Sequence, residues 1–218
     1  MTIRSIERTF AATQIATALL LVTWWMLMGF ALPVQAAQNN FARMIAHANW
    51  VPVNIIGMLA CVAWLFSLPI HVVNQDRAVS LLRFVALLIS GAGVVWFGCI
   101  QYYETFLWPV VVAINPELVQ LKGPLVFGDR LVLVPLLLSG LTVAAGYLVL
   151  MADQIRSRSP HTGSIVLLGT GALVFANGIV FPVRTVGILV FATAMVWHGV
   201  LILRKTVDSH GNKREYQS

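Results

Sequence analysis

Five polar side chains interrupt the long apolar stretches of this chain, and they are the residues best suited to carry chemistry. They are Asn54, Gln101, Glu104, Asn177 and Arg184. A polar group in hydrocarbon costs several kcal/mol unless it finds a partner, so such residues commonly mark a binding site or an ion path. Once the apolar stretches are oriented in a membrane, all five lie near the same face. There they predict a vestibule that opens outward and binds a small solute.

Glu104 is the strongest candidate in this group. It follows Gln101 at helical spacing, so the two side chains share one face of a helix. Buried beside Arg184 or Arg130, the Glu104 carboxyl would accept a proton or hold a cation. At the water interface it would form only an ordinary ion pair. The three amide side chains have the alternative role of hydrogen bonding between helices.

His47 lies just before the second apolar stretch, on the same predicted face as Glu104. A histidine and a carboxylic acid beside an apolar pocket can act as general acid and base near neutral pH. The pair therefore supports a second hypothesis, a membrane enzyme that acts on a lipid or an isoprenoid. The alternative is that His47 is a solvated loop residue.

His71 and His198 raise the question of haem. Their predicted depths differ by one or two helical turns, both toward the inner leaflet. Histidines on facing helices can supply the two axial ligands of one haem. This supports a third hypothesis, an accessory or anchoring subunit of a larger membrane complex that touches haem or quinone. The alternative is that both residues only make contacts within the bundle or at its interface, and no motif indicates another cofactor.

Composition identifies the class of protein that must position these residues. Hydrophobic residues make up 59% of the 218 residues and charged residues 10%, with a mean hydropathy of +0.84, whereas a soluble domain carries about 25% charged residues. The apolar stretches are also longer than the roughly 18 residues that separate a membrane span from a core helix. The net charge of +6 does not indicate nucleic-acid binding, because the basic residues fall in short loops. The predicted fold is all-α, a polytopic membrane protein with six transmembrane helices.

The topology follows from where the basic residues fall. The predicted spans are 11–33, 50–73, 79–103, 131–152, 163–181 and 185–203. With both termini in the cytoplasm, ten Lys and Arg residues lie inside and four outside, which satisfies the positive-inside rule. We therefore expect a bundle over residues 1–205 in a bacterial-type inner membrane and a polar cytoplasmic tail over residues 206–218.

The outer segment 104–130 is long and largely apolar. A third helix continued through it would measure about 50 Å, against a bilayer core of roughly 30 Å. Pro109 and Pro116 are expected to interrupt that helix. The segment is therefore predicted to form an interfacial helix or a re-entrant lid, with Trp108 at the level of the lipid headgroups.

Three functions remain open after these observations. The first is transporter-like binding of a small polar or cationic solute with Glu104 as the key carboxylate, favoured by glycines in the spans that would let helices slide. The others are the complex subunit and the lipid enzyme. The expected partners are the lipid bilayer and either further copies of the chain or a larger membrane complex. No predicted span contains a lysine for a retinal Schiff base, and no Walker, HExxH or GxSxG motif is present.

Overall fold

The computed structural model describes residues 3–37, 39–73, 80–159, 161–176 and 181–215, and these residues contain helices and no strand. The all-α fold class is confirmed. The helices are α1 (Ile3–Phe30), α2 (Val34–Ala37), α3 (Phe41–Ile45), α4 (Trp50–Ser67), α5 (Ile70–Val73), α6 (Leu81–Tyr102), the π-helical η1 (Tyr103–Leu107), α7 (Trp108–Ile114), the 3₁₀-helical η2 (Pro116–Val119), α8 (Arg130–Arg156), α9 (Thr162–Ala176) and α10 (Phe181–Glu215).

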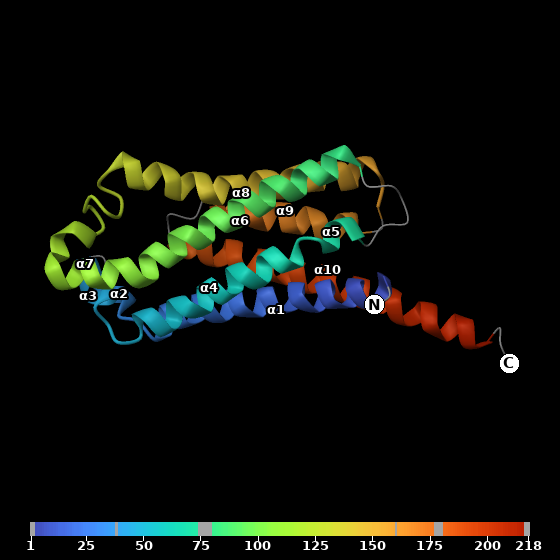
Figure 1. Ribbon diagram of the computed structural model, residues 1–218, viewed down its shortest axis with the longest axis horizontal. Coiled ribbons are helices and arrows are strands. Elements are labelled where there is room, and N and C mark those ends of the chain that lie inside the picture. Colours follow the sequence, from blue (N-terminus) through green and yellow to red (C-terminus); the bar gives the residue numbers. More distant parts are fainter. Residues whose placement is uncertain (1–2, 38, 74–79, 160, 177–180, 216–218) are drawn as a thin grey trace.

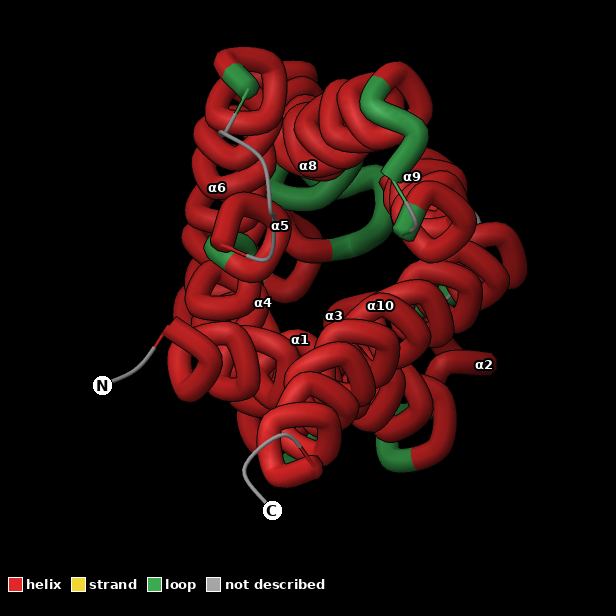
Figure 2. Tube along the Cα trace, turned by 90° about the vertical axis from the view of Figure 1, so that its right-hand side faces the viewer, coloured by secondary structure: helices red, strands yellow, loops and turns green. Residues whose placement is uncertain are grey.

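The long helices form a closed ring. Each packs against two neighbours, in the order α1, α4, α6, α8, α9, α10 and back to α1, as Figure 2 shows in a view along the bundle. Large aromatic side chains, among them Trp64, Tyr147 and Phe191, fill the centre and are almost fully buried. Because neighbours around the ring are mostly consecutive in sequence, short connections suffice to build it.

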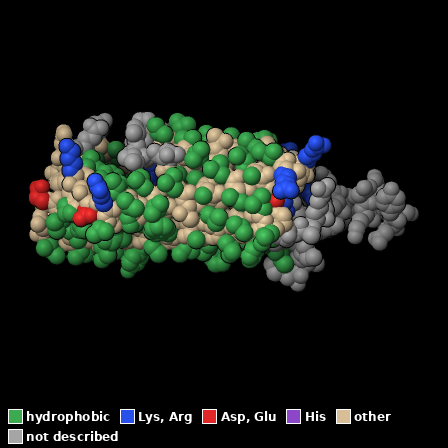
Figure 3. All heavy atoms as spheres, turned by 90° about the horizontal axis from the view of Figure 1, so that it is seen from above, with side chains coloured by type: hydrophobic (Ala, Val, Ile, Leu, Met, Phe, Trp, Pro, Cys, Tyr) green, Lys and Arg blue, Asp and Glu red, His purple; other side chains and the backbone are tan. Residues whose placement is uncertain are grey.

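The outer surface fits a lipid environment. Five helices are long and apolar enough to cross a membrane: Ser5–Phe30, Trp50–Val72, Leu81–Ile114, Arg130–Arg156 and Val183–Lys205. In Figure 3 hydrophobic side chains cover the length of the molecule and basic side chains lie toward its two ends. The predicted fifth span, 163–181, overlaps the shorter apolar helix α9, which has 15 residues and begins at Thr162. Residues 177–180 lie outside the described part of the chain.

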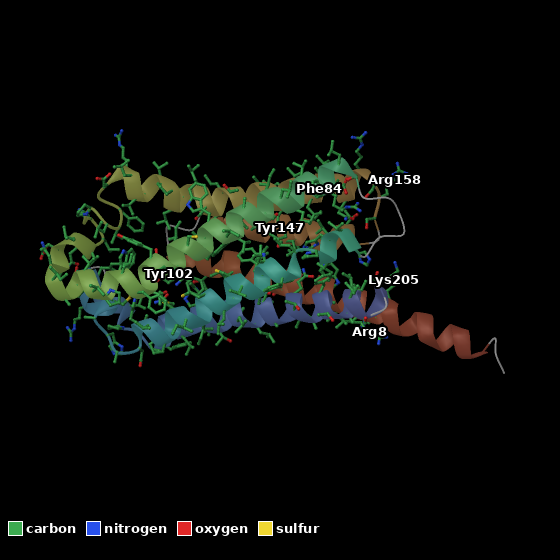
Figure 4. All side chains as sticks on the ribbon, viewed as in Figure 1. Arg8, Phe84, Tyr102, Tyr147, Arg158 and Lys205 are labelled. Atoms are coloured by element: carbon green, nitrogen blue, oxygen red, sulfur yellow. The ribbon has the colours of Figure 1, made fainter. Side chains whose placement is uncertain are left out.

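The two ends of the bundle differ in architecture. The two ends of the described chain lie at the same end of the bundle (Figure 1), which we call the terminus end. Figure 4 places Arg8, Arg158 and Lys205 there. The opposite end is closed by the described residues of 34–49 and 108–129, which we call the cap. The prediction that the terminus end faces the cytoplasm stays a prediction.

The expectation that Pro109 interrupts the third helix is wrong. Residues Leu81–Ile114 form one continuous helical stretch of 34 residues, because a π-helical turn precedes the proline. Within that turn the Trp108 N–H donates to the carbonyl of Tyr103, five residues back rather than four. The chain leaves the helix only at Asn115, whose backbone is extended, followed by Pro116. The segment predicted as a lid is therefore a helix extension plus the turns of the cap.

Helix α10 also runs further than the predicted sixth span, 185–203. It continues to Glu215, so most of the predicted tail over residues 206–218 is helical. A long continuous helix is what the sequence from Arg204 to His210 favours, since it contains neither proline nor glycine.

Close backbone approach joins particular helix pairs. A Cβ atom added to Gly93 of α6 would lie 2.6 Å from the Val143 nitrogen of α8, and one added to Gly171 of α9 would lie 2.6 Å from the Phe191 nitrogen of α10. The α4/α6 contact is looser, because a Cβ on Gly98 would meet the Cys61 Cβ at an ordinary 3.6 Å. Small residues allow the first two pairs to pack backbone against backbone.

Candidate functional site

A cavity of about 720 Å³ lies between the cap and the cap-end halves of the long helices. Its walls come from α1, α4, α6, η1, α8, α10 and the cap, which includes α7. Five of the seven tryptophans of the chain line it: Trp24, Trp25, Trp50, Trp96 and Trp108. Cavities that bind small molecules typically measure about 300–1,000 Å³ and have apolar walls with a few polar groups. By size and lining, this is the candidate site.

Glu104 and Arg184 both line this cavity, as does Gln101. The opposite charges of Glu104 and Arg184 are close enough to interact. Among the described residues, however, the one ion pair within 4.0 Å is Arg83–Asp153, at the terminus end. The cavity therefore presents a carboxylate and a guanidinium that are not joined directly.

Aromatic rings hold the Arg184 side chain in place. Its guanidinium carbon lies 5.2 Å from the centre of the Phe175 ring and 5.3 Å from that of Trp25, distances at which a cation is attracted to the ring face. The Arg184 Nε is buried and has no hydrogen-bond partner. Stacking fixes the position of the guanidinium and leaves hydrogen-bonding capacity unused.

The π-helical turn η1 positions Glu104. In this register the Glu104 carbonyl would accept from the backbone nitrogen of residue 109, which is a proline and carries no hydrogen. The indole Nε1 of Trp50 donates to that carbonyl instead, at 3.0 Å. A side chain of α4 thus completes the backbone hydrogen bonding of η1 at the residue whose carboxylate enters the cavity.

Asn54 lies behind the cavity wall and is not among the residues that line it. Its side-chain oxygen accepts from Gln101 Nε2 at 2.6 Å and from Trp24 Nε1 at 3.3 Å, and its own amide nitrogen donates to the Trp50 carbonyl. Asn54 is 1% exposed and Gln101 2%. These bonds tie α1, α4 and α6 together directly beneath the cavity. Asn54 therefore makes hydrogen bonds between helices, which was the alternative role expected for the amide side chains.

The cap covers the cavity through an aromatic cluster. Phe41 of α3 packs edge-on against Trp108 and Trp50, with ring centres 5.6 and 6.3 Å apart, and the two indoles stack at 6.1 Å. The Gln120 side chain accepts from the Phe41 backbone nitrogen at 2.9 Å. This bond joins the two cap segments, which are far apart in sequence.

Two predicted site residues are not brought to the cavity. His47 is exposed in the turn before α4, where its Nδ1 accepts from the Asn49 backbone nitrogen, and it does not line the cavity. The enzyme hypothesis therefore lacks a histidine beside Glu104. Asn177 lies outside the described residues.

His71 and His198 are brought together, but not as haem ligands. Their rings pack directly, with centres 5.0 Å apart and planes inclined by 31°, and both are buried. Axial ligands bind opposite faces of a haem, so the macrocycle would have to lie between rings that are already in contact. The arrangement does not fit a haem, and among the described residues no three His, Cys, Asp or Glu side chains are grouped to hold a metal ion.

Comparison with known proteins adds no relative: no family model, no curated protein and no solved structure matches the chain. The site is thus defined by geometry alone. The sequence analysis missed its aromatic walls, although one signal was available. Trp24 and Trp25 fall in the outer half of the predicted first span, Trp50 at the outer start of the second, and Trp108 beyond the outer end of the third. Of these, only Trp108 was interpreted, as a residue at the level of the lipid headgroups.

Proposed function

We propose that the protein is a membrane carrier that binds a small zwitterion with an apolar body in the cap cavity. The observation that carries this proposal is that Glu104 and Arg184 both line one cavity with aromatic walls, with no ion pair within 4.0 Å between them. Glu104 would hold the cationic group of the solute, and Arg184 would hold its anionic group.

Charge balance favours a zwitterion over a simple cation or anion. A charge buried away from water is costly unless it is paired. A cationic solute would satisfy Glu104 and bring a second positive charge toward Arg184, and an anionic solute would do the reverse. A solute with both charges satisfies the carboxylate and the guanidinium together and adds no net charge to an apolar site.

The tryptophans favour a solute with an apolar body. Indole rings bury large apolar areas, and their faces attract cations such as ammonium groups. An entirely polar solute would leave most of the cavity wall unmatched. Amino acids with large apolar side chains and zwitterionic lipid headgroups share this chemistry.

The bundle supports a carrier more than a static binding protein. The cavity lies at the cap end, and toward the terminus end the buried Trp64, Tyr147 and Phe191 fill the ring. Carriers commonly place one site between packed helix groups that rock against each other. Helices α6 and α8 would move together as one tightly packed pair, and α9 and α10 as another. The looser contact between α4 and α6 is where the two parts of the bundle would separate.

The proposal is tested by identifying what the protein holds and whether it moves it. We would purify the protein in lipid nanodiscs, identify retained small molecules by native mass spectrometry, and measure the flux of each in proteoliposomes. The expected result is a retained zwitterion whose flux falls at least tenfold in Glu104→Gln and in Arg184→Gln. Glu117→Gln and Arg130→Gln are the matched controls, because both side chains are exposed at the same end.

Two results would overturn the proposal. Retention and flux that are equal in the site variants and in the control variants would remove the role of the two charges. A retained molecule that is never transported would reduce the protein to a binding protein. If the retained molecule is a phospholipid, exchange of labelled lipid between leaflets replaces solute flux as the readout.

A further inference from the structure

A second polar cluster lies at the terminus end, away from the cap cavity. It consists of three histidines in series: His161 from the turn between α8 and α9, His198 from α10, and His71 from α5. Ring centres of His161 and His198 are 5.7 Å apart, and those of His198 and His71 are 5.0 Å apart. The series continues to Tyr147, whose ring lies 5.9 Å from His71.

The three rings form a gradient of burial. His161 is partly exposed at the terminus end, whereas His198 and His71 are 4% and 6% exposed. Tyr147 is 1% exposed, and Figure 4 shows it further from the terminus end than Lys205 and Arg158. A series of polar rings in contact therefore leads from the surface at the terminus end into the bundle.

Hydrogen bonding assigns a protonation state to the central ring. The His198 Nδ1 lies 3.1 Å from the Gln14 side-chain oxygen, which can only accept, so Nδ1 carries the hydrogen in the neutral ring. Nε2 is then the nitrogen that is open to an incoming proton. A protonated His198 keeps its bond to Gln14, which stabilises the charged form.

Several buried nitrogen atoms of the cluster have no hydrogen-bond partner in the protein. His71 Nδ1, His161 Nδ1 and Gln14 Nε2 are buried and have no hydrogen-bond partner among protein groups. Buried polar atoms of this kind are ordinarily satisfied by water. Rings at these separations can be linked directly or through one water molecule, which is the arrangement that a proton relay needs.

Charged groups around the cluster come from several helices. Lys205 of α10 acts on His161, and Arg83 of α6 acts on His71, while Asp153 of α8 neutralises Arg83 at 2.6 Å. Burial, and then Lys205, lower the pKa of His161 below its ordinary value. The entry ring is therefore neutral near pH 7 and able to accept a proton at its bare nitrogen.

We propose that His161, His198 and His71 form a proton path that connects the terminus end with Tyr147 in the bundle interior. A proton that enters at His161 passes to the bare Nε2 of His198 and leaves from that same Nε2, directly or through water, to His71, while the His198 Nδ1–H keeps its bond to Gln14. Each ring is neutral again after the transfer, so no charge or electron is left behind. Where the carrier proposed above holds, this path supplies its coupling proton, and that part rests on the proposed function.

The path is tested with protons alone, so the result does not depend on what the cap cavity binds. The measurement is hydrogen–deuterium exchange at the histidine C2 position, followed by mass spectrometry of the full chain in nanodiscs over a range of pH. This exchange requires a protonated ring and access to water. We expect His198 and His71 to exchange measurably despite their burial, at rates below that of the exposed His47.

The decisive variant is His161→Phe, which removes the entry ring but keeps an aromatic side chain. It is expected to slow exchange at His198 and His71 at least fivefold and to leave His47 unchanged. Gln14→Leu is expected to lower the titration midpoint of His198 with little effect on His161. Should His161→Phe fail to fold, His161→Gln replaces it, with the same expected slowing.

Two outcomes would overturn the path. If His198 and His71 of the unaltered protein do not exchange while His47 does, water does not reach the cluster and the three histidines serve only as packing residues. If both exchange as fast in His161→Phe as in the unaltered protein, their protons enter by another way. Neither outcome bears on the cap cavity, whereas a failure of the carrier proposal would leave the exchange result standing.

Discussion

The hydrogen bond from Trp50 to the Glu104 carbonyl allows a sharp test of how the site is built. In Trp50→Phe the carbonyl loses its donor, and Pro109 has no N–H to replace it. A buried carbonyl without a partner costs about 1–3 kcal/mol, and interhelical hydrogen bonds in membrane proteins reach at most about 1.7 kcal/mol. We expect a loss of about 1.5 kcal/mol in the free energy of unfolding from this bond alone.

A matched control separates the hydrogen bond from the loss of indole volume. Trp108 stacks on Trp50 and is similarly buried, at 5% against 2% exposed, but its Nε1 has no partner. Trp108→Phe therefore removes comparable ring area and no hydrogen bond. Trp50→Phe should be less stable than Trp108→Phe by about 1.5 kcal/mol.

The second half of this test is a rescue. Pro109→Ala restores a backbone N–H at the position from which the π register can serve the Glu104 carbonyl. In the Trp50→Phe background it should recover about 1 kcal/mol more than it does in the unaltered protein. The assay is reversible unfolding in mixed micelles with increasing SDS, followed by circular dichroism. The reasoning is refuted if Trp50→Phe and Trp108→Phe cost the same, or if Pro109→Ala has the same effect in both backgrounds.

Three further predictions concern the bundle. Asp153→Asn should lower the free energy of unfolding by about 3–5 kcal/mol, because it leaves the buried Arg83 unpaired. Replacing both residues (Arg83→Met with Asp153→Leu) should recover most of that loss. A double variant that is no more stable than Asp153→Asn in SDS unfolding would contradict this. Gly93→Ala should lower the free energy of unfolding by about 1–3 kcal/mol, because the added methyl group meets the α8 backbone. Gly98→Ala, whose added Cβ has its nearest atom at 3.6 Å, should change that free energy by no more than about 0.5 kcal/mol. Equal losses in the two variants would show that the α6/α8 contact is not tight. In a background without Cys61 and Cys99, Glu117→Cys should react with a membrane-impermeant maleimide on intact cells and Arg158→Cys only after permeabilisation; the reverse pattern would invert the topology.

The class of fold could be predicted from the sequence because hydrophobic length is a strong signal. Apolar stretches that end at polar turns locate the long helices, and the expected third and fourth spans begin within two residues of α6 and α8. The third helix was ended too early for a physical reason. Its continuation depends on a π-helical turn that makes Pro109 harmless, and on a donor from Trp50, which is distant in sequence.

The site could be predicted only in part. Gln101, Glu104 and Arg184 were singled out because polar residues in apolar stretches are few, and they do line one cavity. Two kinds of information were missing from the sequence. Spans do not reveal which faces point inward, so the tryptophan walls went unrecognised. They also do not reveal ring contacts, so haem ligation stayed open for His71 and His198 beside the alternative of simple packing.

The most direct test of the central claim uses three probes with the same apolar body and different charge: phenylalanine, phenethylamine and 3-phenylpropionate. Binding to the protein in nanodiscs is followed by the intrinsic fluorescence of the tryptophans that line the cavity. The account predicts that the unaltered protein binds the zwitterion most tightly, that Glu104→Gln shifts the preference to the anion, and that Arg184→Gln shifts it to the cation. The same order of affinity in all three proteins would contradict it.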